Sequence, residues 1–290
     1  MCYHGDMEWA RGILRMQLRF VDYRIEDRQG VRDLIDDAFV REDALDCLAQ
    51  FPQYGFLALR GEDLIGVSVF TGNDAMTSFT MYVRRDARRA GIGTQIVNEM
   101  QRRMKDAGVQ KAMCDYVREE CVDAFAAKHG YRCEFSSNFM RYRGGKLPAP
   151  EADIAPYRDE DYDRCQRIFA EAFHKMRVDV GMESELALPC AEDRESHNAR
   201  RDDIFVLRDG GEIVGALKLD GAEIDAIAVQ IDRWGKGYGR QLCAYAVNAL
   251  LDRGVSQITL WAVEGNPAKH LYEKMGFVSE RLHAFVSRVL

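Results

Sequence analysis

The chain has 290 residues, of which 47% are hydrophobic, and its net charge is −7 at pH 7. This length corresponds to about two domains of 100–200 residues each, and the apolar fraction is enough to fill two cores. No apolar run approaches the ~18 residues that a membrane-spanning helix needs, and the early residues Asp6 and Glu8 do not fit a secretory signal. We therefore expect a cytoplasmic protein without a membrane partner.

The charges and cysteines narrow the function classes further. The first 150 residues carry 22 acidic and 22 basic side chains, so the excess of negative charge belongs to the second half. An acidic surface disfavours nucleic acid and favours cationic small substrates. The eight cysteines are scattered, without a CxxC pair or a nearby histidine cluster. This pattern indicates reduced thiols rather than a disulfide framework or a metal site.

The first elements occur twice along the chain. After a lead-in segment, residues 1–15, a strand is predicted at 18–21 and one helix through 31–39. The second half repeats this order at 157–173 and then gains twelve residues, mainly within 174–203. Two strands joined by a hairpin turn follow in each half. They are predicted at 56–59 and 64–69, and again at 204–207 and 213–217.

A glycine-rich stretch comes next in each half, at residues 88–94 and 233–240. Each follows a short run that ends in valine and opens a segment with helical periodicity. Glycines let the backbone approach a ligand closely, and the free amides of a first helical turn favour a phosphate. Neither stretch is a GxxxxGK[ST] loop, and Leu242 stands where a dinucleotide-binding GxGxxG would place its third glycine.

The rest of each half continues the repeat. A helix, a strand, a second helix and a closing strand are predicted, with the closing strands at 135–142 and 282–289 and a Gly- and Pro-containing linker at 144–150. Corresponding residues are separated by a constant 146 positions, which marks a duplicated unit. The matching pairs are Val83 and Val229, Gly91 and Gly237, Gly93 and Gly239, Gly108 and Gly254, and Gly130 and Gly276.

These motifs resemble the GNAT superfamily of acyl-CoA-dependent N-acyltransferases. The signature of that family is a strand ending in valine, then [Q/R]-x-x-G-x-[G/A], and later a helix reading L-Y-E-K-x-G-F. The first copy matches with Val83 and residues 88–93, and the second with Val229, residues 234–239 and residues 271–277. The resemblance implies an α/β (α+β) fold with two tandem domains, 16–146 and 147–290. Each would hold a mixed, mostly antiparallel, partly splayed sheet flanked by helices.

The resemblance also implies an acetyl-CoA-dependent N-acetyltransferase, with a small-molecule or peptide amine as the acceptor. The backbone near Ala228 and Val229 would bind the thioester oxygen, and Asn266 would lie near the pantetheine. The loop residues that would hold the phosphates of CoA are Trp234, Gly235, Lys236, Gly237, Tyr238, Gly239 and Arg240 in the second copy, and Arg88, Arg89, Ala90, Gly91, Ile92, Gly93 and Thr94 in the first.

Proton transfer is expected only in the second copy. Tyr272 occupies the tyrosine position of the family and would protonate the departing thiolate, because a phenol with a pKa near ~10 suits that task. Glu223, or Asp225 on the same strand face, would deprotonate the amine. The first copy has Ala126 and Thr77 at the corresponding positions, so we expect it to be non-catalytic.

Two departures from the family pattern leave alternatives open. Trp234 fills the slot that Arg88 fills in the first copy, and Gly265 takes the usual asparagine position one residue before Asn266. A non-catalytic acyl-CoA-binding protein, or catalysis in the first domain with its better-matched loop, remains an alternative. Nothing around Cys243 suggests an activated thiolate, which favours direct transfer. The segment 174–203 is expected to line the acceptor site, and the oligomeric state is not predicted.

Overall fold

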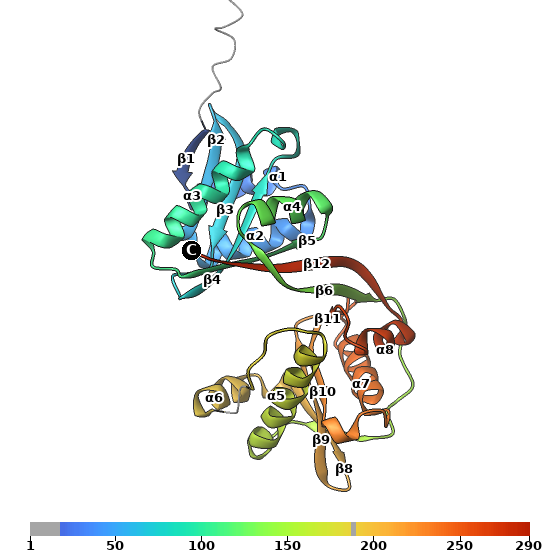
Figure 1. The fold of residues 1–290 in the computed structure, drawn as a ribbon. Coiled ribbons are helices and arrows are strands. Elements are labelled where there is room, and N and C mark those ends of the chain that lie inside the picture. Colours follow the sequence, from blue (N-terminus) through green and yellow to red (C-terminus); the bar gives the residue numbers. More distant parts are fainter. Residues whose placement is uncertain (1–17, 187–189) are drawn as a thin grey trace, which may run out of the picture. The chain divides into compact units, whose positions relative to one another are not determined.

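The computed structural model describes residues 18–186 and 190–290, so the lead-in segment 1–15 lies outside the described residues. The chain divides into two compact units. The first unit comprises residues up to 133 together with 285–290, and the second comprises 134–284. Each unit contains an open mixed sheet with helices against it, which confirms the expected α/β class (Figure 1).

The first unit is built on a sheet in the order β1-β2-β3-β4-β5, and the end of β12 lies beside β5. Strands β1 to β4 pair antiparallel, whereas β4 and β5 are parallel. The elements are β1 (Leu18–Asp22), α1 (Arg28–Leu34), α2 (Ala38–Gln50), β2 (Phe56–Arg60), β3 (Asp63–Phe70), β4 (Met76–Val83), α3 (Ile92–Asp106), β5 (Lys111–Val117) and α4 (Glu120–Lys128).

Helices α1 and α2 replace the single helix predicted through residues 31–39, so that prediction is wrong. The helical pattern breaks after Leu34, where Ile35 adopts an extended conformation. The Asp37 carboxylate then accepts hydrogen bonds from the amides of Phe39 and Val40 and begins a new helix. An aspartate at this position satisfies amides that otherwise have no partner in a first helical turn. The apolar spacing continues across the break because both helices contribute to one core cluster.

The second unit repeats this arrangement, in the strand order β12-β6-β11-β10-β9-β8-β7. Strands β10 and β11 are parallel, and the neighbouring pairs from β10 to β7 and from β11 to β6 are antiparallel. The elements are β6 (Arg132–Tyr142), β7 (Asp153–Pro156), α5 (Tyr162–Asp179), α6 (Ala191–Ala199), β8 (Ile204–Asp209), β9 (Glu212–Asp220), β10 (Glu223–Val229), α7 (Tyr238–Asp252), β11 (Thr259–Val263), α8 (Ala268–Met275) and β12 (Phe277–Val289).

Two apolar layers hold the second unit together. One joins α7 to the sheet through fully buried residues such as Leu242 and Leu250. The other joins α5 to the opposite face through Ile168 and Phe169. The segment 174–203 forms the end of α5, α6 and a short 3-10 turn, apart from residues 187–189, which the structure does not describe. No helix in the described ranges is both long and apolar enough to cross a membrane.

The closing strands of the two copies belong to opposite units. Strands β6 and β12 correspond to each other in the sequence repeat, because Arg132 lies 146 residues before Val278. From Glu134 onward β6 belongs to the second unit, where it pairs with β11. From Phe285 onward β12 belongs to the first unit. Each unit is therefore completed by a strand from the other copy of the repeat. The predicted boundary at residue 146 describes the sequence repeat and stays a prediction.

Candidate active site

The two parallel strands at the centre of the second unit separate along their length. Strand β10 pairs with β11 at Glu223, which lies opposite Thr259, and among the described residues the rest of β10 pairs with β9 alone. Strand β9 follows β10 as far as Val229. The carboxyl end of β10 therefore has one backbone edge that no strand covers. A splayed pair of this kind leaves backbone groups available to a ligand.

The uncovered edge presents the amide of Val229. The amide of Gln230 donates to Val214 on β9 at 2.8 Å, and Ala228 lies opposite Ala216. Successive residues of an antiparallel pair direct their amides to alternate sides, so the Ala228 amide points to β9 and the Val229 amide points away from it. Of the two predicted backbone donors, the strand geometry favours Val229.

The glycine loop follows directly and ends in a helix N-terminus. Gly235 has φ 78° and Gly237 has φ 87°, and Gly237 is the N-cap of the 15-residue helix α7. A Cβ at either glycine would meet no atom within 4 Å, so the loop borders open space. Left-handed glycines followed by the first turn of a helix present amides and a positive dipole end to an anion. The residues present therefore fit the phosphates of CoA.

The first unit forms the same loop with different residues. Gly91 has φ 78° and begins α3, as Gly237 begins α7. Arg89 occupies the position of Gly235 and adopts φ 64°, the one left-handed non-glycine residue in the described chain. The Ile92 side chain is 4% exposed and packs in the core, so only its backbone faces the loop. Both loops keep the shape of an anion cradle.

Trp234 and Arg88 make the same hydrogen bond in the two copies. The Trp234 Nε1 donates to the carbonyl oxygen of Val229 at 2.7 Å, and the Arg88 Nε donates to the carbonyl oxygen of Val83 at 2.9 Å. The tryptophan therefore preserves a contact that closes the strand end onto the loop. The sequence showed this position only as a departure from the family arginine.

Other loop residues divide between structural and exposed positions. The Tyr238 hydroxyl donates to Asp209 at 2.7 Å, which ties the start of α7 to β8. Lys236 and Arg240 are exposed, and within the described residues neither side chain makes a hydrogen bond or ion pair. They are the cations of the second cradle that an anion can recruit. In the first unit Thr94 is held by His129, at 3.1 Å from its Nε2.

Glu223 is half-buried at the point where the strands separate. Burial raises the pKa of its carboxyl, and the nearby carboxylates of Asp225 and Asp220 raise it further, whereas a hydrogen bond from the Trp261 side chain lowers it. A carboxylate with a raised pKa is a stronger base than one in water. Thr77, its counterpart in the first unit, is buried, and its hydroxyl donates to the carbonyl of Asp74 at 3.2 Å.

Asp225 is the extra residue of a β-bulge. The register to β9 shifts between Ile224 and Ala226, which leaves Asp225 without a partner of its own. Its carboxylate lies 3.9 Å from Arg200. A bulge bends its strand and increases the local twist. The bulge thus accounts for the divergence of β10 from β11 just beyond Glu223.

Tyr272 lies on α8, which packs beside the start of α7. Leu271 Cδ2 is 3.6 Å from the place that a Cβ on Gly239 would occupy. The Tyr272 ring packs edge-on against Phe277, and burial raises the pKa of its hydroxyl. Within the described residues the hydroxyl makes no hydrogen bond. In the first unit Ala126 takes this position.

Asn266 has a structural role in the loop before α8. Its side-chain oxygen accepts a hydrogen bond from the amide of Ala268, the first residue of α8, at 2.9 Å. Gly265 has φ 87°, and a Cβ there would meet Val180, which follows the end of α5, at 3.5 Å.

Cys243 on α7 is fully buried, and burial raises the pKa of its thiol to about 12, so the thiol stays protonated near neutral pH.

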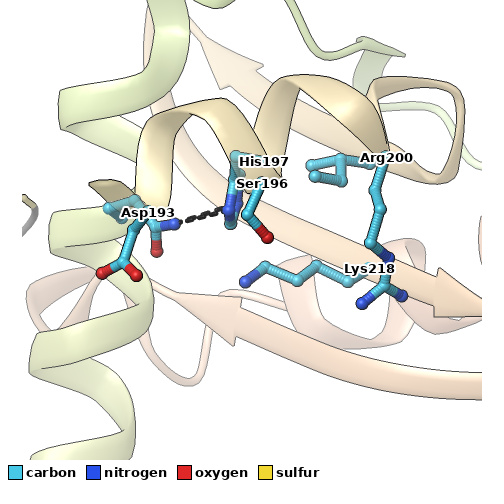
Figure 2. A pocket seen from close by; sticks show the side chains of 7 residues that line it. Asp193, Ser196, His197, Arg200 and Lys218 are labelled. Carbon is cyan, nitrogen blue, oxygen red and sulfur yellow. Dashed lines mark hydrogen bonds between the residues drawn. The ribbon is translucent and has the colours of Figure 1, made fainter. Parts of the chain in front are cut away.

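Sequence reasoning missed a cavity on the α5 side of the sheet. It measures about 320 Å³ and lies where α6 packs over α5 and β9 (Figure 2). Gln166, Asp193, Ser196, His197, Arg200, Ile204 and Lys218 line it. The signal in the sequence was Lys218, a single cation inside the apolar run 213–219.

In the described chain no three His, Cys, Asp or Glu side chains are grouped to hold a metal ion.

Comparison with known families and structures agrees with this geometry. A sequence model of the Acetyltransferase (GNAT) family matches residues 20–131 and again residues 162–277. The chain therefore belongs to the GNAT acetyltransferase family and contains two tandem GNAT domains. The comparison with curated proteins found no match.

Solved structures share the fold across nearly the whole chain. A GCN5-related N-acetyltransferase from Sphaerobacter thermophilus is 17% identical with a TM-score of 0.73, over 94% of this chain and 95% of that chain. A tandem GNAT protein from the clavulanic acid biosynthesis pathway is 16% identical with a TM-score of 0.64, over 94% of this chain and 98% of that chain. At these identities the likeness establishes the architecture alone.

Proposed function

We propose that the protein is an acetyl-CoA-dependent N-acetyltransferase whose second unit transfers the acetyl group directly to an amine. The observation that carries this proposal is the grouping of four features in one unit. They are the splayed edge at Val229, the open glycine cradle, the half-buried Glu223 and the unbound hydroxyl of Tyr272. The first unit keeps a cradle but has Thr77 and Ala126 in place of the base and the acid.

Each residue has a distinct task in this mechanism. Acetyl-CoA, when bound, supplies an acetyl thioester. Glu223 takes a proton from the ammonium form of the acceptor, so that the amine nitrogen has a free electron pair. The Val229 amide donates a hydrogen bond to the carbonyl oxygen as negative charge develops on it. The nitrogen would bond to the acetyl carbon as the carbon–sulfur bond breaks. The Tyr272 hydroxyl would give its proton to the departing thiolate and regain one from the acetylated nitrogen.

The cradle residues position the cofactor rather than react. The amides around Gly235 and Gly237 bind the pyrophosphate, with the exposed Lys236 and Arg240 as additional cations. Trp234 holds the end of β10 against the loop through the Val229 carbonyl. The first unit has the same carbonyl contact but carries Thr77 and Ala126 in place of the base and the acid, so a bound acyl-CoA there would have a positioning or scaffold role without proton transfer.

The test is the release of free CoA thiol from acetyl-CoA over a panel of primary amines. We expect turnover with at least one amine in the wild type. Tyr272→Phe should lower kcat by about 10²–10⁴-fold, the usual range for removal of a general acid, with little change in acetyl-CoA affinity. Turnover that is unchanged in Tyr272→Phe would remove this residue from the mechanism. A wild type that releases no thiol with any amine would favour the non-catalytic alternative.

A further inference from the structure

The cavity beneath α6 contains a cation without a counter-ion. Lys218 lies on β9 and is half-buried, and its ammonium group rests 4.5 Å from the ring centre of Phe169. It forms no ion pair within the described residues. Burial lowers the pKa of this lysine. A half-buried charge without a partner costs folding free energy, and an anionic ligand would offset that cost.

Among the described residues, no lining carboxylate forms an ion pair with Lys218, although the charges of Asp193 and of Asp225 raise its pKa. His197 is 7% exposed, and burial lowers its pKa to about 4, so its ring is neutral near pH 7. Asp193 is exposed and its carboxylate accepts from the Cys190 thiol at 3.1 Å. The Arg200 guanidinium donates to the Leu219 carbonyl at 2.9 Å and lies 3.4 Å from Asp220. The described lining therefore offers one cation without an ion pair, Lys218, whereas Arg200 is shared with Asp220 and Asp193 adds one exposed carboxylate.

Neutral polar groups complete the lining and are held in place. The Gln166 amide nitrogen lies 2.7 Å from His197 Nδ1, and the His197 ring meets the rings of Tyr157 and Tyr162 edge-on. Figure 2 shows Ser196 on α6 with its hydroxyl directed toward the Lys218 side chain. A hydroxyl and an ammonium group that face one space can bind the two oxygens of a carboxylate.

Lys218 of the cavity and the proposed base Glu223 lie on neighbouring strands of the sheet, β9 and β10. Lys218 is the register partner of Ala226, and Glu223 is the partner of Asp220 on the same pair of strands. On β9 the partners Lys218 and Asp220 are only two positions apart, because Asp225 is the extra residue of the bulge, which corresponds to roughly 7 Å at about 3.3 Å per residue. Arg200 also contacts Asp225, the bulged neighbour of Glu223. A molecule of amino acid size can therefore place an amine near Glu223 and an acid group near Lys218.

We propose that the acceptor is a small amine-bearing carboxylic acid, an amino acid in chemical class, whose carboxylate binds at Lys218 in this cavity. The inference rests on the proposed function, because it assigns the acceptor of that same site. A volume of about 320 Å³ suits part of a small molecule rather than a folded partner. Segment 174–203, expected from the sequence to line the acceptor site, supplies Asp193, Ser196, His197 and Arg200.

The test compares amino acids with their carboxamides, which keep the amine and lose the negative charge. For the wild type we expect a higher kcat/KM with the best amino acid than with its amide. Lys218→Met keeps the length of the side chain and removes its charge, so the ratio of acid to amide should fall at least about tenfold. Lys105→Met, the same change at an exposed lysine of α3, should leave the ratio unaltered.

Two results would overturn the inference. One is a wild-type preference for amides, and the other is an acid-to-amide ratio that Lys218→Met does not change while acetyl transfer itself proceeds. Calorimetric binding of the same amino acids without acetyl-CoA separates this inference from the proposed function. If no amine is acetylated, binding of an amino acid but not its amide, lost in Lys218→Met, would still support the cavity. Equal or absent binding of both would reject it.

Discussion

Trp234 and Arg88 show how one position keeps its structural task while its side chain changes. Both donate a hydrogen bond to the carbonyl of the valine that ends the central strand. An unpaired carbonyl at this point would leave the strand end free to move relative to the glycine loop. The amide and the bonded carbonyl of Val229 face the same edge of strand β10. The side chain at position 234 therefore also orients the Val229 amide.

Trp234→Phe removes the donor and keeps most of the ring. We expect kcat/KM for acetyl transfer to fall about tenfold, corresponding to one net hydrogen bond. Trp234→Arg introduces the donor that the first copy uses and should recover most of the loss. Steady-state measurement of kcat/KM for Trp234→Phe and Trp234→Arg tests this expectation. Equal kcat/KM in the two variants would show that the carbonyl contact has no role in catalysis.

Glu223 links activity and stability to pH through its raised pKa. Its folded pKa lies above the unfolded value, so the protonated carboxyl favours the folded state below the ordinary glutamate pKa of about 4.3, and this stabilisation is lost as the pH rises through the folded pKa. At pH 7 the ionised side chain is a cost to folding. The same ionised form is the one that accepts a proton from the amine.

Glu223→Gln removes that cost together with the base. At pH 7 we expect the variant to be at least as stable as the wild type in thermal or urea unfolding, with the difference shrinking as the pH falls through the raised folded pKa and constant below about 4.3. Its kcat should fall by about 10²-fold or more. A wild-type rate that stays constant as the pH is lowered through the raised pKa would exclude Glu223 as the base.

Among the elements, the bulge in β10 has the clearest functional consequence. Ile224 packs in the α7 layer, whereas Ala226 packs in the α5 layer. In a regular strand two residues at this spacing would face the same layer, so Asp225 is an inserted residue. Removing it would leave Ile224 and Ala226 on their present faces with a regular strand between them. The extra residue is therefore not needed for core packing; its effect is to make β10 diverge from β11.

Deletion of Asp225 is expected to give a folded protein with a thermal midpoint equal to or above that of the wild type. Its acetyl-CoA affinity should drop at least about tenfold, because a straighter β10 would close the gap beside β11. Asp225→Ala is the matched control, since it keeps the bulge and removes only the charge. If the deletion binds acetyl-CoA as tightly as Asp225→Ala does, the bulge does not create the binding gap.

Some features of these elements could be predicted from the sequence, and others could not. The glycine spacing and the preceding valine predicted both strand–loop–helix turns, because a short local pattern decides them. The break between α1 and α2 was missed because Asp37 lies in a continuous apolar spacing. Lys218 and His197 are 21 positions apart and meet only because α6 folds over β9, so no local pattern could join them. The bulge was hidden because Glu223 and Asp225 alternate regularly in sequence.

At the level of the whole chain, the two copies depend on each other for their closing strands. Strand β6 precedes the linker, yet from Glu134 it belongs to the second unit and pairs with all five residues of β11. Sequence periodicity predicted both closing strands but could not assign their partners, because pairing depends on tertiary contacts. A fragment cut at the linker would expose β11 as an unpaired edge.

The fragment 147–290 is therefore expected to aggregate or to lack a cooperative unfolding transition. The longer fragment 132–290 restores β6 and should be recovered in soluble, folded form. Circular dichroism during heating and size-exclusion chromatography of the two fragments provide the comparison. Soluble and cooperatively folded 147–290 would show that the second copy closes its own sheet, in agreement with a domain boundary at residue 146.

The central claim is that the second unit binds acetyl-CoA in the cradle at Gly235 and Gly237. Calorimetric titration of acetyl-CoA into the wild type and into Gly237→Glu tests it, because the variant places bulk and negative charge in the open space of the loop. Gly254→Glu is the control: Gly254 has φ 81° and open surroundings just after the end of α7, so it introduces similar backbone strain, of about 1–2 kcal/mol, at the opposite end of that helix. We expect Gly237→Glu to lose a binding site that Gly254→Glu retains. Undiminished binding by Gly237→Glu would contradict the assignment of the active unit.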